Sequence, residues 1–272
     1  MRRLAAILTL TMCASLLHAN MIVSGQRRQS AAAPPPAPAD VTNGLVRWWT
    51  FQSTNSTGGF PTRTGYGTDV DWTNGGMTWT SASNVISSDG GAVGALFRTL
   101  DTELQFANST TDRQFSIGAW INVALAGGGW RIMDRDGYYL GGARCWNFCL
   151  QSGKPTIYMF SDGANYFYIE STNVLASNTW YHVAVSYMPG ASPERFGVAM
   201  YVNGISNGST TAEGGNYSSL NLNSPLYTFL GRSGGAYAPA GHEGDLRVYN
   251  RALSAGEWRT VFSNGPPPVT YQ

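Results

Sequence analysis

The sequence has few charged residues and almost no lysine. Only 12% of its 272 residues are charged, against about 25% in an ordinary soluble domain, and Lys154 is the single lysine. Four arginines precede Asp40, whereas all 16 acidic residues lie from Asp40 onward, so the rest of the chain is formally negative. The low charge excludes a coiled coil, a helical bundle and a charged disordered chain. A negative body without a basic stripe also makes nucleic acid a poor candidate partner.

Long helical periodicity is also missing from the body of the chain. From Leu45 onward, short runs rich in β-branched and aromatic residues recur instead, which is typical of strands. These runs are 46–51, 115–121, 156–160, 166–170, 180–187, 198–202 and 246–249. Asn-Gly and Asp-Gly dipeptides, such as Asp162-Gly163 and Asn203-Gly204, separate many of them and favour tight hairpin turns. The pattern predicts an all-β sandwich or barrel.

One segment near the C-terminus is the exception. Ser254 is followed three residues later by Glu257, which is the spacing of a helix capping box. Trp258, Val261 and Phe262 then fall on one helical face. We therefore predict one short helix over residues 253–262.

The N-terminus predicts export. Two arginines precede an apolar run from Leu4 to Leu17, the order of a secretory signal, and a run of fourteen residues is too short to span a bilayer as a helix. We assign residues 1–25 to a signal peptide, with cleavage or retention as an anchor left open. The Pro/Ala-rich residues 26–40 form a linker. No membrane span is expected after cleavage, and the expected location is secreted, periplasmic or cell envelope.

Two cysteines, Cys145 and Cys149, remain after export of the chain. An oxidising compartment favours a disulfide between them. On a straight strand, their Cα atoms would lie about 13 Å apart, beyond disulfide reach. The predicted bond therefore requires a turn or bulge through residues 146–148.

Five segments resemble, in order and spacing, the LamG-like domains of the concanavalin A-like lectin/glucanase superfamily. They are 45–51 (LVRWWTF), 115–121 (FSIGAWI), 180–187 (WYHVAVSY), 201–204 (YVNG) and 244–254 (GDLRVYNRALS). The resemblance implies a domain over residues 41–264, followed by a tail over 265–272. Its fold would be a jelly-roll sandwich of two curved antiparallel sheets with one short C-terminal helix. Lectins, glycosidases, lyases and adhesion domains share this fold, so it does not choose among them.

Catalytic motifs are incomplete. Glycosidases of the superfamily carry E-x-D-x-x-E on one strand, and here Glu243 and Asp245 are followed by Val248 where the third carboxylate should stand. His182 lies in the strand motif of the family and is interpreted as structural. A hydrolase or lyase site assembled from distant residues stays open as an alternative.

Structural calcium is the one metal that the resemblance suggests. Many relatives hold it with oxygens of the first strand and an aspartate of the last, and Asp245 matches that aspartate. Gln52 stands at the first-strand position and offers only a neutral oxygen. The alternative is that Asp245 pairs with Arg247 or caps a turn.

Residues 130–168 are dense in aromatic and amide side chains, which suit the apolar faces and hydroxyls of a sugar. The candidate sugar-binding residues are Trp130, Arg131, Tyr138, Tyr139, Trp146, Tyr166 and Tyr168, with Arg144, Asn147 and Asn165 as further polar groups. Strand alternation predicts that Tyr166 and Tyr168 share a face opposite Phe167. It also predicts that Trp146 points with Phe148, away from Cys145 and Asn147. Trp130 and Trp146 are expected near sheet edges, with exposed rings.

The sequence thus favours an exported, noncatalytic domain that binds a glycan or polysaccharide. Two alternatives stay open: a glycan-degrading enzyme of the same fold, and an adhesive or structural envelope protein. A groove of convergent carboxylates would indicate the enzyme, and a broad apolar patch would indicate the adhesin.

Overall fold

The computed structural model describes most of the chain from residue 39 to residue 265. The described ranges are 39–51, 72–73, 78–80, 85–88, 95–98, 102–108, 110–124, 129–136, 144–190, 197–222, 227–230 and 240–265. The chain divides into two compact units, residues 1–36 and 37–272. All described residues belong to the second unit.

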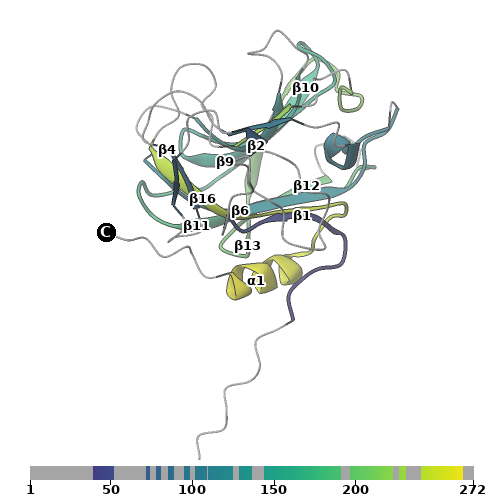
Figure 1. Ribbon diagram of the computed structural model, residues 1–272. Coiled ribbons are helices and arrows are strands. Elements are labelled where there is room, and N and C mark those ends of the chain that lie inside the picture. The colour runs from purple at the N-terminus through teal and green to yellow at the C-terminus, as the bar shows by residue number, and fades with distance from the viewer. Residues whose placement is uncertain are drawn as a thin grey trace, which may run out of the picture. The chain divides into compact units, whose positions relative to one another are not determined.

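Two antiparallel sheets of eight strands each form the domain (Figure 1). Sheet A has the order β13-β12-β11-β6-β16-β4-β3, and β1 also pairs with β16. Its strands are β1 (Leu45–Trp49), β3 (Thr78–Thr80), β4 (Val85–Ser88), β6 (Phe115–Val123), β11 (Tyr181–Tyr187), β12 (Val198–Val202), β13 (Ile205–Asn207) and β16 (Gly241–Tyr249). Strands that are far apart in sequence pair directly in this sheet: β16 lies between β1 and β6 and pairs with both.

Sheet B has the order β14-β10-β9-β8-β7-β15-β5-β2. Its strands are β2 (Trp72–Thr73), β5 (Ala95–Arg98), β7 (Trp130–Asp136), β8 (Arg144–Gln151), β9 (Lys154–Phe160), β10 (Tyr166–Ser171), β14 (Ser209–Gly214) and β15 (Tyr227–Leu230). A short 3-10 helix, η1 (Thr102–Gln105), precedes β6. The predicted all-β jelly-roll sandwich is confirmed.

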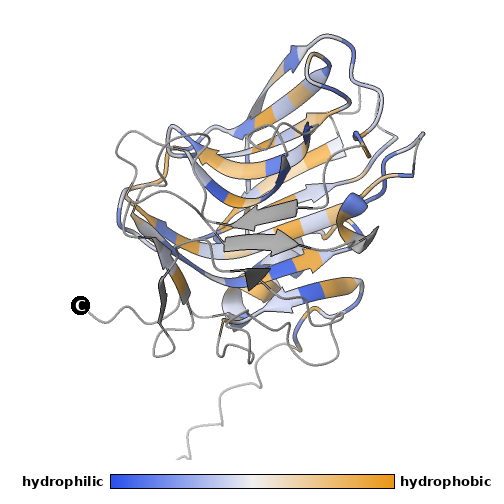
Figure 2. Cartoon of the chain, turned by 45° about the horizontal axis from the view of Figure 1, so that its top comes forward, coloured by the Kyte–Doolittle hydropathy of each residue, from blue (hydrophilic) through white to orange (hydrophobic). Residues whose placement is uncertain are grey.

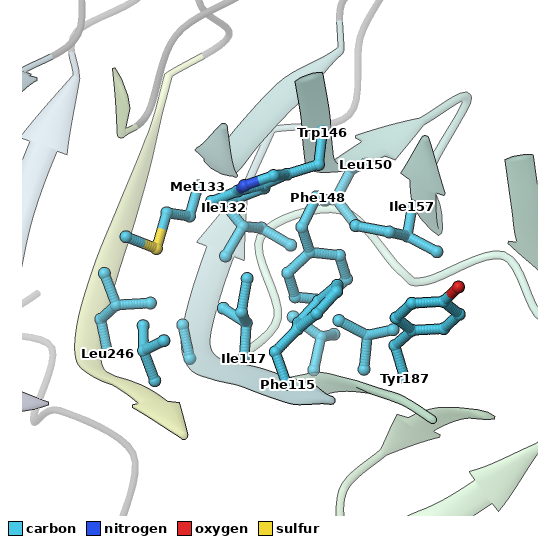
Figure 3. Close-up of a cluster of buried hydrophobic side chains, with 14 of the residues drawn as sticks. Phe115, Ile117, Ile132, Met133, Trp146, Phe148, Leu150, Ile157, Tyr187 and Leu246 are labelled. Atoms are coloured by element: carbon cyan, nitrogen blue, oxygen red, sulfur yellow. The ribbon is translucent and has the colours of Figure 1, made fainter. Parts of the chain in front are cut away.

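The core lies between the two sheets, and Figure 3 shows its centre. Phe115 and Ile117 of β6 meet Trp146 and Phe148 of β8, and all four side chains are fully buried. The rings of Phe115 and Trp146 lie 6.4 Å apart between centroids. Burial of such large apolar side chains is the main term that stabilises a sandwich, at about 1.5–3 kcal/mol for each side chain.

The helix α1 (Ala255–Asn264) covers the outer face of sheet A (Figure 1). Its first turn carries the predicted capping box, in which Ser254 and Glu257 exchange hydrogen bonds with each other's backbone N–H groups. Trp258 is fully buried in a second apolar cluster with Ala184, Tyr201 and Tyr249 of the sheet. The predicted C-terminal helix is therefore confirmed, and the central strands β6, β11 and β16 of sheet A are buried on both faces.

The outer face of sheet B is different. Apolar and more polar residues alternate along strands such as β10, next to the edge strand β14 (Figure 2): Phe167 and Ile169 are buried, and the tyrosines between and before them are half-buried. Within the described part of the chain, no helix lies on this outer face. On this face Asp134 of β7 and Asn147 of β8 are buried, whereas side chains of β9 and β10 are half-buried. The part over β9 and β10 is therefore where a ligand could bind.

Candidate functional site

A row of side chains crosses the outer face of sheet B at right angles to its strands. Tyr168 of β10 pairs with Tyr158 of β9, Tyr158 pairs with Asn147 of β8, and Asn147 pairs with Asp134 of β7. Directly paired residues of antiparallel strands point to the same face. We name Tyr168, Tyr158, Asn147 and Asp134 the cross-strand row.

Aromatic rings form one half of this face. The ring centroids of Tyr158 and Tyr168 lie 4.9 Å apart, and Phe160 extends the group at 5.8 Å from Tyr158. Tyr166 continues it at 5.5 Å from Phe160. The guanidinium carbon of Arg144 lies 3.8 Å from the ring centre of Phe160, a cation–π contact. The three tyrosines and Arg144 are half-buried, so they present flat surfaces outward.

Charged and polar groups flank the rings. Lys154 and Glu170 form an ion pair of 2.6 Å, and Arg131 contacts Asp134 at 3.3 Å. The hydroxyl of Tyr158 donates a hydrogen bond to Oε1 of Gln151. Burial, with the charges of neighbouring side chains, raises the pKa of Tyr158 above its ordinary value, so the hydroxyl stays a hydrogen-bond donor at neutral pH.

Asn147 is the most deeply buried amide of the face. Its side chain is 3% exposed, and within the described part of the chain its Oδ1 atom has no hydrogen-bond partner. Nearly all buried polar groups in proteins are paired, so such an atom calls for an explanation.

The prediction that Trp130 and Trp146 are exposed near sheet edges is wrong. Both indoles are fully buried in the core between the sheets, where Nε1 of Trp130 donates to Oε2 of Glu243 and Nε1 of Trp146 donates to the carbonyl of Leu104. The alternation along β8 does place Trp146 with Phe148, as predicted. Sheet A packs against that face, so the two largest aromatic side chains of the predicted site stabilise the fold instead.

Other predicted sugar-binding residues do reach the outer face. Tyr166 and Tyr168 share it, opposite the buried Phe167, as strand alternation predicts. Arg131 lies on it beside Asp134. Tyr138 and Tyr139 lie outside the described residues.

Asn165 lies in the turn between β9 and β10 rather than on the sheet face. Its Oδ1 accepts a hydrogen bond from the backbone N–H of Asn216, and its Nδ2 donates to Asp162. These contacts hold the turn to the loop that follows β14, so the prediction that Asn165 serves the same surface is not supported.

Sequence reasoning missed Tyr158. The signal was available, because the turn at 162–163 joins two alternating strands and Tyr158 then pairs across it with Tyr168. Pairing the two predicted strands through this turn would have added Tyr158 to the site.

The predicted disulfide is contradicted, because Cys145 and Cys149 are not joined. The pairing of β7 with β8 shifts by one residue at Cys145, which belongs to the core cluster together with Trp146. Cys149 pairs with Thr156 in a regular stretch of β8 and β9. The bulge thus turns Cys145 to the inner face, against the predicted alternation with Trp146, and the two sulfur atoms lie on opposite faces of the sheet.

Asp245 occupies a bulge in β16 with a φ of 47°. Its Oδ1 accepts a hydrogen bond of 2.5 Å from Nε1 of Trp48, and its Oδ2 lies 3.0 Å from the guanidinium of Arg247. Gln52 lies outside the described residues. No group of three acidic, histidine or cysteine side chains gathers among the described residues. Asp245 thus forms the alternative pairing with Arg247, and structural calcium stays a prediction.

Two further titratable residues lie away from the outer face of sheet B. Glu243 is fully buried between the sheets, and burial raises the pKa of its carboxyl well above the ordinary value. His242 is half-buried at the end of sheet A, where its Nδ1 lies 2.7 Å from the hydroxyl of Ser87. Neither group faces the cross-strand row.

A family model described as "Concanavalin A-like lectin/glucanases superfamily" matches residues 98–257, more than half of the chain. Comparison with curated protein sequences gave no match. No helix of the described part is both long and apolar enough to cross a membrane.

Among solved structures, the fold is similar to the ligand-binding domain of botulinum neurotoxin serotype D in complex with N-acetylneuraminic acid. The identity is 12%, the TM-score is 0.56, and the match covers 82% of this chain and 51% of that one. The fold is also similar to the binding domain of Paraclostridial Mosquitocidal Protein 1. The identity is 16%, the TM-score is 0.54, and the match covers 82% of this chain and 52% of that one. A third similar structure is that of Trypanosoma rangeli sialidase, with an identity of 16% and a TM-score of 0.53. The match covers 82% of this chain and 33% of that one. The matched region is about half of these chains or less, and identities this low show the fold alone.

Proposed function

The chain belongs to the concanavalin A-like lectin/glucanases superfamily, and from that premise we propose that it binds a glycan without cleaving it. The observation that carries the proposal is the cross-strand row on the outer face of sheet B. This row combines two adjacent tyrosine rings with an amide and a carboxylate on paired strands.

The chemistry of the row suits a sugar. A pyranose ring has apolar C–H faces that lie against flat side chains, and hydroxyls that need fixed hydrogen-bonding partners. Tyr158 and Tyr168 supply the flat surfaces, and Gln151, Lys154 and Glu170, which are exposed or half-buried, supply polar groups beside them. Sites of this kind combine apolar area with a few placed polar groups. One similar structure was solved with N-acetylneuraminic acid, which supports a glycan as the class of partner.

Glycoside hydrolysis needs two carboxyl groups that flank the scissile bond, one of them protonated. On the described part of this face, the carboxylates are Asp134 and Glu170, and each is held in an ion pair. Glu243 has the raised pKa of a general acid, but it lies between the sheets, where a polysaccharide has no access. The arrangement therefore favours binding over hydrolysis, although a sialidase shares the fold.

The N-terminal sequence extends the proposal to location. Its charged, apolar and Pro/Ala-rich order supports export to the cell envelope or medium. Glycans of cell surfaces and matrices are the partners available there.

The proposal is tested by removing one ring. Tyr168→Ala is expected to weaken binding to the glycans found on an array by about two- to twelvefold, because a stacked aromatic contact contributes about 0.5–1.5 kcal/mol. Tyr168 is half-buried, so the melting temperature should change little. Tyr168→Phe keeps the ring and should keep most of the affinity.

Tyr181→Ala is the matched control, because it removes a half-buried tyrosine from sheet A. This variant should bind as the parent does. Assays for new reducing ends and for unsaturated products, run on the same glycans, should stay at background. Turnover in either assay would replace the proposal with the enzyme alternative.

A further inference from the structure

The outward-facing side chains of β9 and β10 form a strip that runs in the direction of the strands. Phe160 pairs with Tyr166, and two residues further along, Tyr158 pairs with Tyr168. Glu170 follows on the same face of β10 and is half-buried like the two tyrosines before it. Residues on one face of a strand are about 7 Å apart. The aromatic pairs and the carboxylate therefore succeed one another along the strands.

Across the strands the strip is narrow. On one side, Asn147 of β8 and Asp134 of β7 are 3% and 2% exposed, so neither offers a surface to a ligand. On the other side lies the edge strand β14, whose Gly214 pairs with Tyr166. A Cβ atom added to Gly214 would lie 2.4 Å from the ring of Tyr166, so this ring occupies the space beside the glycine. The accessible surface is therefore only two strands wide.

Charged groups lie at both ends of the strip. At one end, the guanidinium carbon of Arg144 lies 3.8 Å from the ring centre of Phe160, and this planar group adds a flat, hydrogen-bonding surface. At the other end, Lys154 and Glu170 form an ion pair of 2.6 Å, and their side chains are 28% and 19% exposed. Lys154 and Phe160 are six residues apart on β9, which is about 20 Å along an extended strand. The strip is thus much longer than a single sugar ring.

We infer that the ligand is an internal stretch of a linear polysaccharide that lies along β9 and β10. Successive sugar units then lie on the guanidinium end, on the pair of Tyr158 and Tyr168, and on the ion pair. This inference rests on the proposed function and names the class of glycan. A single terminal sugar covers only one of these positions, and a chain laid across the strands meets the buried side chains of β8 and β7.

The length of the bound chain is measured with cello-, xylo- and galacturono-oligosaccharides, from the monosaccharide to the hexasaccharide. In a series that binds, affinity is expected to rise by about two- to twelvefold with each unit that reaches a further ring, the scale of one stacked contact. Affinity should level off once the strip is covered. Chemical reduction of the reducing end should leave the affinity of the hexasaccharide unchanged.

A monosaccharide that binds as tightly as the hexasaccharide would overturn the inference and leave the proposed function standing. The same holds if binding on the glycan array is confined to branched or terminal sugars. Binding of no glycan, on the array or in these series, would overturn the proposed function itself.

Tyr166→Ala shortens the strip at one end. The variant is expected to bind the hexasaccharide about two- to twelvefold more weakly and to level off at a shorter chain than the parent. Tyr166→Phe keeps the ring and should restore the series of the parent. If Tyr166→Ala and the parent give the same series, the inference is wrong.

Lys154 reports on the other end without any substitution, because it is the only lysine of the chain. Acetic anhydride labels its amine, and mass spectrometry measures the rate. Saturating hexasaccharide of the bound series is expected to suppress labelling of Lys154, whereas the N-terminal amine in the same sample should be labelled as before. Unchanged labelling of Lys154 would show that the chain does not reach the ion pair, and would overturn the inference.

Discussion

His182 is the most isolated polar side chain of the described region. It is fully buried, and within the described part of the chain neither ring nitrogen has a hydrogen-bond partner. The rings of Trp120, Trp258 and Phe262 surround it at centroid distances of 5.6, 5.7 and 6.4 Å. Burial, together with the charge of Arg247, lowers its pKa from 6.5 to about 3. The sequence interpretation of His182 as structural agrees with this site, although the hydrogen bond expected of a structural histidine is not formed.

A histidine with a lowered pKa makes folding sensitive to acid. Between pH 6.5 and about 3 the unfolded chain binds the proton and the folded chain does not. The free energy of unfolding should therefore be constant above pH 6.5 and fall below it, by up to about 1.4 kcal/mol per pH unit from this residue. Urea unfolding at pH 7, 6 and 5 measures the slope. In His182→Leu, the free energy of unfolding should depend much less on pH. In His242→Gln, which changes a half-buried histidine, most of the pH dependence should remain. An equal slope in parent and His182→Leu would contradict this explanation.

At the scale of elements, the docking of α1 depends on one glycine. A Cβ atom added to Gly118 of β6 would lie 2.6 Å from the ring of Trp258, closer than any real contact. The strand is central in sheet A, with β11 on one side and β16 on the other, so it has little room to move. The absence of a side chain at Gly118 is what lets the helix lie flat on the sheet.

Gly118→Ala is therefore expected to destabilise the domain by about 1–3 kcal/mol, the usual cost of overpacking. Denaturant unfolding, followed by tryptophan fluorescence, measures the loss. Gly163→Ala is the matched control, because its added Cβ would meet nothing within 4 Å, and it should be close to neutral. If the two variants unfold at the same denaturant concentration, Trp258 does not pack as described.

At the scale of the whole molecule, the folded unit begins just before the first strand. Asp40 forms an ion pair of 2.6 Å with Arg247, and the hydroxyl of Tyr249 donates to the carbonyl of Val41. These contacts tie the start of the unit to β16. The exported protein is predicted to lack its N-terminal apolar run, so its N-terminal sequence should begin beyond Leu17.

A chain of residues 37–272 should unfold at the same temperature as the full chain, because it keeps these contacts. A chain of residues 42–272 lacks Asp40 and Val41 and should unfold at a lower temperature. Native protein that starts at Met1 inside the cytoplasm would refute export, and a large loss of stability in the 37–272 chain would show that the fold needs the preceding residues.

Local patterns in the sequence determined the fold class, the C-terminal helix and the relative sides of residues within a regular strand. Ser254 and Glu257 predict the helix start because capping depends on neighbours three residues apart. Tyr166 and Tyr168 share a face because side chains alternate along any strand. Neither feature needs knowledge of the rest of the chain.

The tertiary structure alone decided which face of sheet B is the core. Alternation places Trp146 opposite Asn147, but it does not say which of the two meets sheet A. That choice is made by strands such as β6 and β16, which are distant in sequence and bury the face with the larger apolar area. The bulge at Cys145 likewise depends on how β7 pairs with β8. The same packing turned the indoles of Trp130 and Trp146 inward and left Tyr158, Tyr166 and Tyr168 half-buried on the outer face, where a glycan could bind.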